Sequence, residues 1–215
     1  MSDPAVVISP NPGGPDDPLG ESVAEAGAAP LRVFACRDLR LVIGRGQDPA
    51  RELVLEQVSA DGVPVHRRLS GGGTVVLAPG VVVVALRLPR RDAGVDEVFA
   101  RVNAILIPVL SDLAGTRVET HGHGDLALAV GVARPRKILG ASLRLRRDDA
   151  IYLGALLVDD LVPVMERYLR HPSREPAYRT GRNHRDFCTH LGTCQVTAPA
   201  LVAALAAALP PLTAS

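Results

Sequence analysis

Short runs of apolar residues, many of them alternating with polar ones, follow one another from residue 31 onward and predict a series of β-strands. The run at 81–88 is apolar at nearly every position, which is typical of a strand with both faces buried, so we place it at the centre of a sheet. The other strands are expected at 31–35, 39–43, 63–67, 75–77, 118–120, 126–130, 137–146 and 151–158.

Four segments show helical signals instead. Apolar residues recur at helical spacing over 95–113, where Pro108 predicts a kink. Asp48 before Pro49 is a typical N-cap and first helical position, and predicts a helix that runs to about residue 60. Further helices are expected at 160–169 and 198–209. The expected fold class is therefore α+β, a mixed or antiparallel β-sheet with helices packed on one side.

Residues 1–30 lack such a pattern and are rich in Pro, Gly, Asp and Ala. We expect them to form a mobile N-terminal tail, with at most a short helix near 20–26. The remaining residues, 31–215, are expected to form one folded domain, because a chain of 215 residues is long enough for one sizeable core.

Composition narrows the class of protein. Apolar residues make up 47% of the chain and aromatic ones only 3%, so aliphatic side chains must fill a globular core. A net charge of +1 gives no general attraction to nucleic acid or to a membrane surface, and the longest apolar run, 81–86, is too short to span a bilayer. The three cysteines, Cys36, Cys188 and Cys194, form no disulfide framework, and no signal-peptide pattern is present, so we expect a cytoplasmic protein.

One cation differs from all the others. Lys137 is the only lysine among 24 basic residues, the rest being arginine. An ammonium is a compact point charge whose pKa shifts readily on burial, whereas a guanidinium is a broad fork that stays protonated. A site that holds a carbonyl or phosphate oxygen with one cation, or moves a proton near neutral pH, needs lysine. Codon bias is the alternative explanation; we interpret Lys137 as a functional residue.

A glycine-rich loop lies between two expected strands. It consists of Arg67, Arg68, Leu69, Ser70, Gly71, Gly72, Gly73 and Thr74, and Val75 opens the next strand. Glycines let backbone N–H groups approach an anion or a carbonyl closely, and the arginines and serine suit a carboxylate or phosphate. The loop lacks the Gly-Lys-Ser/Thr end of a Walker loop, and a strand follows it where a dinucleotide fingerprint has a helix. A plain hairpin connection, the alternative, has no need for two arginines.

The order Arg-Arg-x-Ser-Gly-Gly-Gly resembles the signature loop of the lipoate–protein ligase family, within the wider biotin and lipoate ligase fold. Four further segments resemble family segments in order and spacing: 42–49 with Glu52, the turn 122–125, the strand 137–142 and the strand 152–157. The resemblance covers 31–209 and implies a ligase-like catalytic domain, here without the separate small C-terminal domain of many relatives.

The resemblance implies an enzyme that attaches lipoate or octanoate to the lysine of a lipoyl carrier domain or an H-type carrier protein. Such ligases form lipoyl-adenylate from lipoate and ATP with Mg²⁺, and then pass the acyl group to the acceptor. Lys137 would hold the acyl carbonyl and phosphate oxygens, with the glycine loop folded over the acyl chain. Asp125 would lie near the nucleotide or its metal, and Gly140 and Ser142 would complete the binding site.

Four positions that are polar in the family are apolar or small here: Leu77, Val81, Gly124 and Leu153. These departures leave two alternatives open. Related octanoyl transferases need no ATP and move the acyl group from acyl carrier protein to a cysteine paired with the lysine; a Cys188 and Lys137 pair would serve this chemistry. The second alternative is a non-catalytic relative that binds an acyl ligand or a carrier domain.

The histidines and remaining cysteines give no metal signal. His121, His123 and His190 fit no standard zinc spacing with Cys188 and Cys194, so we expect no metal site. His121 and His123 are expected in a turn beside Asp125, and Cys36 in the core.

Overall fold

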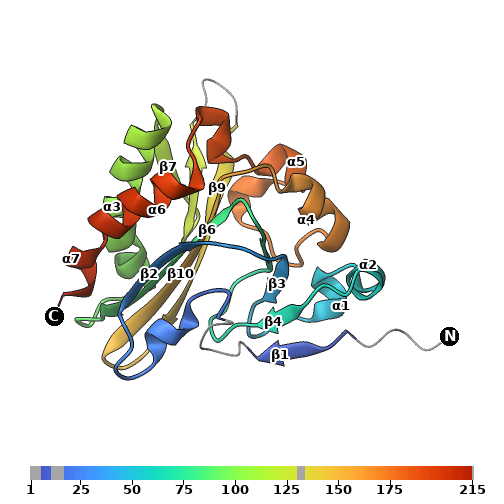
Figure 1. The fold of residues 1–215 in the computed structure, drawn as a ribbon, viewed down its shortest axis with the longest axis horizontal. Coiled ribbons are helices and arrows are strands. Elements are labelled where there is room, and N and C mark those ends of the chain that lie inside the picture. The colour runs from blue at the N-terminus through green and yellow to red at the C-terminus, as the bar shows by residue number, and fades with distance from the viewer. Residues whose placement is uncertain (1–5, 11–16, 130–133, 215) are drawn as a thin grey trace.

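The computed structural model describes residues 6–10, 17–129 and 134–214, and its strands form two sheets (Figure 1). The larger sheet has the order β2 (Leu31–Ala35), β6 (Val81–Pro89), β10 (Asp149–Leu157), β9 (Arg136–Leu145), β8 (Asp125–Leu128) and β7 (Val118–His121), and every neighbouring pair in it is antiparallel. The smaller, mixed sheet has the order β1 (Ile8–Pro10), β4 (Val65–Arg67), β3 (Arg40–Ile43) and β5 (Val75–Leu77).

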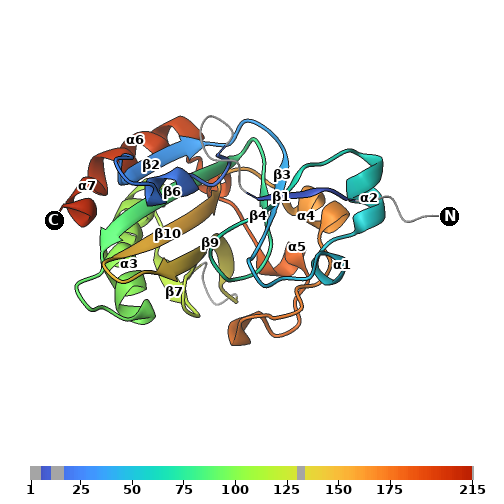
Figure 2. The same ribbon diagram turned by 90° about the horizontal axis from the view of Figure 1, so that it is seen from below.

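The longest helices cover one face of the larger sheet. These are α3 (Val95–Ala114) and α6 (Ala198–Ala208), with the short α7 (Pro210–Thr213) after them (Figure 1). On the opposite face lie α4 (Val162–Tyr168) and α5 (His184–Phe187), with the smaller sheet and its helices α1 (Pro49–Glu52) and α2 (Leu55–Ala60) beyond them (Figure 2). The described residues also form the 3-10 helices η2 (Glu21–Ala24), η3 (Ala177–Arg179) and η4 (Leu191–Cys194). The α+β class is confirmed.

Strand β6 separates two hydrophobic cores. Val82 and Val84 face the core under α3 and α6, whereas Val81 and Val83 face the core shared with the smaller sheet and α4. Successive side chains of a strand point to opposite faces, so an unbroken apolar run is what a strand between two cores requires. The central position predicted for this strand is confirmed, since β6 lies between β2 and β10.

The helix predicted from Asp48 to about residue 60 is two short helices. Asp48 accepts the capping hydrogen bond from the Ala50 N–H at 3.0 Å, as expected. The break comes at Leu53, which forms an antiparallel bridge with Leu169, and Val54, whose N–H donates to the Tyr168 carbonyl at 2.9 Å. The backbone groups that would continue the helix are thus used to join α1 and α2 to the end of α4.

The N-terminal segment from Asp17 onward is packed against the larger sheet, which corrects the expectation of a mobile tail up to residue 30. Leu19 and Val23 are buried, and the Asp17 carboxylate accepts the N–H groups of Glu21 and Ser22, each at 2.8 Å. The segment was missed because its apolar residues are isolated between small ones and show no period. Residues 1–5 and 11–16 of the predicted tail lie outside the described residues.

Candidate functional site

A cavity of about 320 Å³ opens between the glycine loop, the larger sheet and the segment 170–188, a size within the range of small-molecule sites. One wall is apolar because alternate residues of β10 face it and α4 closes it. That wall is formed by Val75, Leu153, Ala155, Leu157, Met165 and Leu169. The remaining lining carries charged and polar side chains, so the cavity can hold a ligand that is apolar at one end and ionic at the other.

Lys137 reaches this cavity from β9, where its ammonium pairs with Asp125 on β8. The distance from Lys137 Nζ to Asp125 Oδ1 is 2.8 Å. Gly140 of β9 is the partner of Asp125 in the antiparallel register, and a β-carbon at Gly140 would come within 2.8 Å of Nζ. The glycine therefore leaves the space in which the ammonium lies. The structure thus brings Lys137, Asp125 and Gly140 together. Their roles toward a ligand stay predictions.

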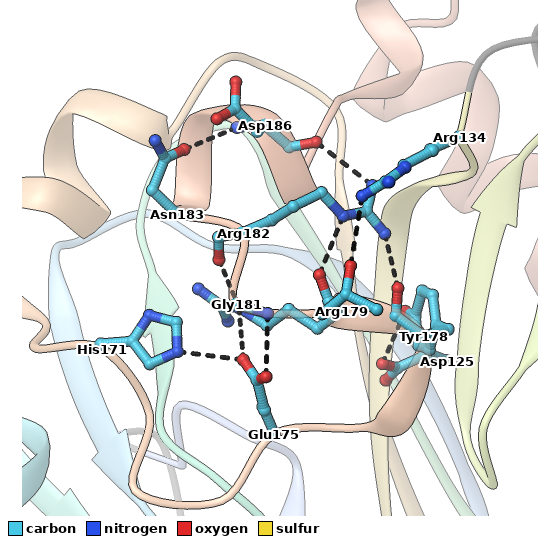
Figure 3. Close-up of polar contacts among 11 residues, drawn as sticks. Asp125, Arg134, His171, Glu175, Tyr178, Arg179, Gly181, Arg182, Asn183 and Asp186 are labelled. Atoms are coloured by element: carbon cyan, nitrogen blue, oxygen red, sulfur yellow. Dashed lines mark hydrogen bonds and ion pairs between the residues drawn. The ribbon is translucent and has the colours of Figure 1, made fainter.

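The carboxylate of Asp125 is also held from the other side. Tyr178, on η3, donates from its hydroxyl to Asp125 Oδ2 at 2.9 Å (Figure 3). Burial, together with the nearby carboxylate, raises the pKa of this phenol, so it remains a donor at neutral pH. The ring of Tyr178 stacks on His121 with centroids 4.9 Å apart. Tyr178, Asp125 and Lys137 thus form one connected chain of polar contacts.

The two loop arginines bind backbone carbonyl groups. Arg68 is buried and donates to the carbonyls of Gly71 and Gly73, at 2.7 and 2.6 Å, so it fixes the curve of the loop from inside. Burial lowers the pKa of its guanidinium to about 10. Arg67 does not line the cavity; it donates to three carbonyls of the segment after β3, the shortest contact being 2.8 Å to Gln47.

The glycine loop presents unused donors to its surroundings. The N–H groups of Gly71, Gly72 and Gly73 donate no hydrogen bond within the described part of the chain. Thr74 and Val75 line the cavity, and the buried Thr74 hydroxyl has no partner among the described residues. Such donors suit a carbonyl or anionic oxygen.

Ser70 and Ser142 connect the loop to β9. Their hydroxyl oxygens are 2.9 Å apart, and Ser142 also lines the cavity. The loop is therefore fastened to the strand that carries Lys137.

Cys188 lies beside Lys137 in space, as the transferase alternative requires. The two residues form a parallel β-bridge, the Thr189 N–H donates to the Lys137 carbonyl at 2.9 Å, and both side chains line the cavity. Burial raises the pKa of the Cys188 thiol, and the charges of Lys137 and Arg179 oppose that effect only in part. The thiol is placed at the site but is protonated at neutral pH.

Several cavity residues were not identified from the sequence, and most come from the segment 170–188. They are Arg170, Arg174, Arg179 and Phe187, together with Leu19 from the N-terminal segment and Glu52 from α1. His184 lines the cavity as well. The one available signal was the density of arginine and histidine in this segment, which shows no helical or strand period. His121 flanks the β7–β8 turn and His123 lies in it, as expected.

The four departures from the family pattern fall in different places. Leu77 and Val81 belong to the buried core and do not line the cavity, whereas Leu153 is part of its apolar wall. Gly124 leaves room for Phe99, since a β-carbon there would lie 2.7 Å from that ring. All four replacements thus serve packing or an apolar ligand surface.

No group of three or more His, Cys, Asp or Glu side chains is arranged as a metal site within the residues the structure describes. The carboxylates that line the cavity already have partners: Asp125 binds Lys137 and Tyr178, and Glu52 accepts a hydrogen bond from Ser173. In the same described ranges, no helix combines the length and apolarity needed to cross a bilayer.

Comparisons with known proteins agree on one family. Its model, described as the lipoyl protein ligase A/B catalytic domain, matches residues 18–209. A protein of Aeropyrum pernix that carries the name lipoate-protein ligase A is 35% identical over 143 residues, which is 66% of this chain and 51% of that relative. The chain therefore spans about half the length of this curated relative.

Two solved structures share the fold at low identity. A bi-partite lipoate protein ligase of Thermoplasma acidophilum, studied with its E2 lipoyl domain, gives a TM-score of 0.73 at 21% identity, covering 85% of this chain and 70% of that one. A lipoate-protein ligase A bound with ATP gives 0.72 at 20% identity, covering 91% and 78%. Because the family model spans most of the described residues, from the buried N-terminal segment to the end of α6, the chain belongs to the lipoyl protein ligase A/B catalytic domain family.

Proposed function

We propose that this chain attaches lipoate to the lysine of a lipoyl carrier domain or H-type carrier protein, through lipoyl-adenylate formed from ATP. The observation that carries the proposal is that one ammonium, Lys137, shares a cavity with an apolar wall and with the glycine loop. A relative with the same fold is bound with ATP, and another was studied with its lipoyl domain, which supports both substrates.

The proposed reaction requires the site to stabilise the negative charge that develops on the reacting oxygens. Adenylation and acyl transfer both place negative charge on oxygens of the acyl carbonyl and the phosphate, and fixed donors aimed at those oxygens lower the barrier. Lys137 would supply the cation and Gly73, the loop glycine that lines the cavity, an N–H donor, while the apolar wall holds the acyl chain. Asp125 holds the ammonium in place through the 2.8 Å contact. Because the cavity carboxylates are already engaged, we treat Mg²⁺ as part of the ATP complex rather than as a resident ion.

A second candidate function is ATP-independent octanoyl or lipoyl transfer from acyl carrier protein. The specific observation that favours it is the β-bridge between Lys137 and Cys188 inside one cavity. The protonated state of the buried thiol speaks against it, because the thiolate is the nucleophile. We place either activity in the cytosol, since Cys36, Cys188 and Cys194 are all free thiols.

Intact-protein mass spectrometry separates these functions. The purified chain is incubated with lipoate, ATP, Mg²⁺ and a lipoyl domain; the expected result is AMP and a lipoylated acceptor, with Cys188→Ala as active as the wild type. Octanoyl transfer from acyl carrier protein that stops in Cys188→Ala, with a thioester on the wild-type chain, would select the transferase. Absence of product with every donor, while acyl ligands still bind, would select a non-catalytic relative.

A further inference from the structure

Arg179 is a buried cation that lines the cavity. It is 5% exposed and lies at the end of η3. Its guanidinium packs over the ring of Phe187, with Cζ 4.7 Å from the centroid. Its Nε donates to the Arg182 carbonyl at 2.8 Å (Figure 3). These contacts fix the direction of the guanidinium and use only one of its nitrogens.

The terminal nitrogens of this guanidinium have no hydrogen-bond partner among the described residues. Nη2 is buried and makes no hydrogen bond to any described residue. The nearest carboxylate, Glu175, reaches only Nε, at 3.6 Å, and already accepts from the Gly181 N–H and from His171, each at 2.9 Å (Figure 3). A buried donor without a partner is costly, so native proteins rarely keep one unless a ligand or water completes it.

The surroundings of Arg179 carry excess positive charge. Lys137 Nζ lies 6.0 Å from the centroid of the same Phe187 ring, and Arg182 Cζ lies 5.1 Å from it. Two carboxylates offset part of this charge: Asp125 is paired with Lys137, and Glu175 lies 3.6 Å from Arg179 Nε and also binds His171. The neighbouring His184 and Cys188 are neutral, because burial lowers the pKa of the imidazole and raises that of the thiol. Burial also lowers the pKa of the Arg179 guanidinium, which nevertheless stays protonated at neutral pH. The part of the cavity around Arg179 therefore suits an anionic ligand.

We propose that Arg179 binds the ligand's anionic oxygens in this cavity, either the carboxylate of a medium-chain acid or a nucleotide phosphate. The identity of the anion rests on the proposed function, whereas the anion site itself follows from the unpartnered guanidinium. Arg182 cannot take this role, because its nitrogens donate to the carbonyls of Pro135, Tyr178 and Arg179.

Isothermal titration calorimetry tests the proposal with three probes: octanoate, AMP and inorganic phosphate. The variants are Arg179→Gln and Arg179→Lys, with Arg185→Gln as the matched control, since Arg185 is an exposed arginine of α5 that pairs with Glu166 outside the cavity. Circular dichroism and thermal melting confirm that each variant folds. The affinity for at least one anion should fall about tenfold or more in Arg179→Gln, fall less in Arg179→Lys, and stay unchanged in Arg185→Gln.

The anion whose affinity falls in Arg179→Gln identifies the ligand group that Arg179 binds. If only the affinity for octanoate falls, Arg179 binds the carboxylate. If only the affinity for AMP falls, it binds the phosphate. If the wild type binds inorganic phosphate through Arg179 but neither octanoate nor AMP, the anion site stands and the proposed ligase function fails. If the affinities of Arg179→Gln for all three anions equal those of the wild type, or if no anion binds, the inference about Arg179 is wrong.

Discussion

The carbonyl oxygen of Gly72 packs directly against the Cα of Gly44, so that a β-carbon on Gly44 would overlap it. Gly44 follows β3, and Gly72 is the central glycine of the loop, with a φ of 94° that favours glycine. The Gln47 side chain donates to the same Gly72 carbonyl at 3.3 Å, and Arg67 donates to the Gly44 carbonyl at 3.2 Å. The segment after β3 is therefore the surface on which the glycine loop rests.

Gly44→Ala should displace the glycine loop. The backbone of Gly72 cannot move without breaking the contacts of Arg68 to Gly71 and Gly73, so we expect a loss of roughly 1–3 kcal/mol in stability and a larger relative loss of activity. Chemical denaturation and steady-state kinetics measure the two effects. Gly46→Ala is the control, because a β-carbon there meets no atom within 4 Å. Equal stability and equal activity of Gly44→Ala and Gly46→Ala would show that the position of the loop does not depend on the contact between Gly44 and Gly72.

Lys137→Arg should lose catalysis while keeping the fold. The ammonium lies between Asp125 and the space left by Gly140, where a β-carbon would already be 2.8 Å from Nζ, and the broader guanidinium does not fit that space. We expect kcat to fall by about 10²-fold or more, as for the loss of a preorganised oxyanion donor, with little change in melting temperature. Arg185→Lys, the reverse exchange at an exposed site, controls for the chemistry of the substitution. Activity close to that of the wild type in Lys137→Arg would remove the role given to this lysine.

The sequence could predict those parts of the site whose functional residues are neighbours in the chain or lie on one strand. The glycines and arginines of 67–74 stand together in the chain, and Lys137, Gly140 and Ser142 lie on one strand whose apolar run marks it. The turn that carries Asp125 was found by its resemblance to a family segment. The pairing of this carboxylate with Lys137 was not predicted; it follows from the antiparallel contact of β8 with β9.

The remaining parts could not be predicted, because long-range contacts determine them. The strands of the smaller sheet are three or four residues long, and nothing in so short a run tells which sheet it joins. The segment 170–188 is held by arginine side chains on backbone carbonyls, for example Arg182 on those of Pro135 and Tyr178, and such contacts leave no period in the sequence. Tyr178 and Arg179 were missed for this reason.

Deletion of residues 1–28 should destabilise the protein. It removes the buried side chains of Leu19 and Val23 and the Glu21 carboxylate, which accepts the Leu69 N–H of the glycine loop at 2.7 Å. We expect the melting temperature to fall by roughly 5–15 °C, from the apolar burial alone. Deletion of residues 1–16 is the control, since it keeps Asp17 and the residues that follow. Equal melting temperatures for the two truncated chains would show that 17–28 contribute nothing to stability.

Stability should depend on the ionisation of His184. Burial, aided by the charges of Arg179 and His171, lowers the pKa of this imidazole from 6.5 to about 4 in the folded chain. Between these values the unfolded state binds more protons than the folded state, so the free energy of unfolding should fall as the pH is lowered from 6.5 towards 4 and should be fully retained above 6.5.

Urea denaturation at a series of pH values measures this slope for the wild type and for His184→Gln, which carries no ionisable group at the same place. The decline should be shallower in His184→Gln, whereas His123→Gln, a replacement of an exposed histidine, should follow the wild type. Parallel curves for the wild type and His184→Gln would mean that the pKa of this imidazole is the same in the folded and the unfolded chain.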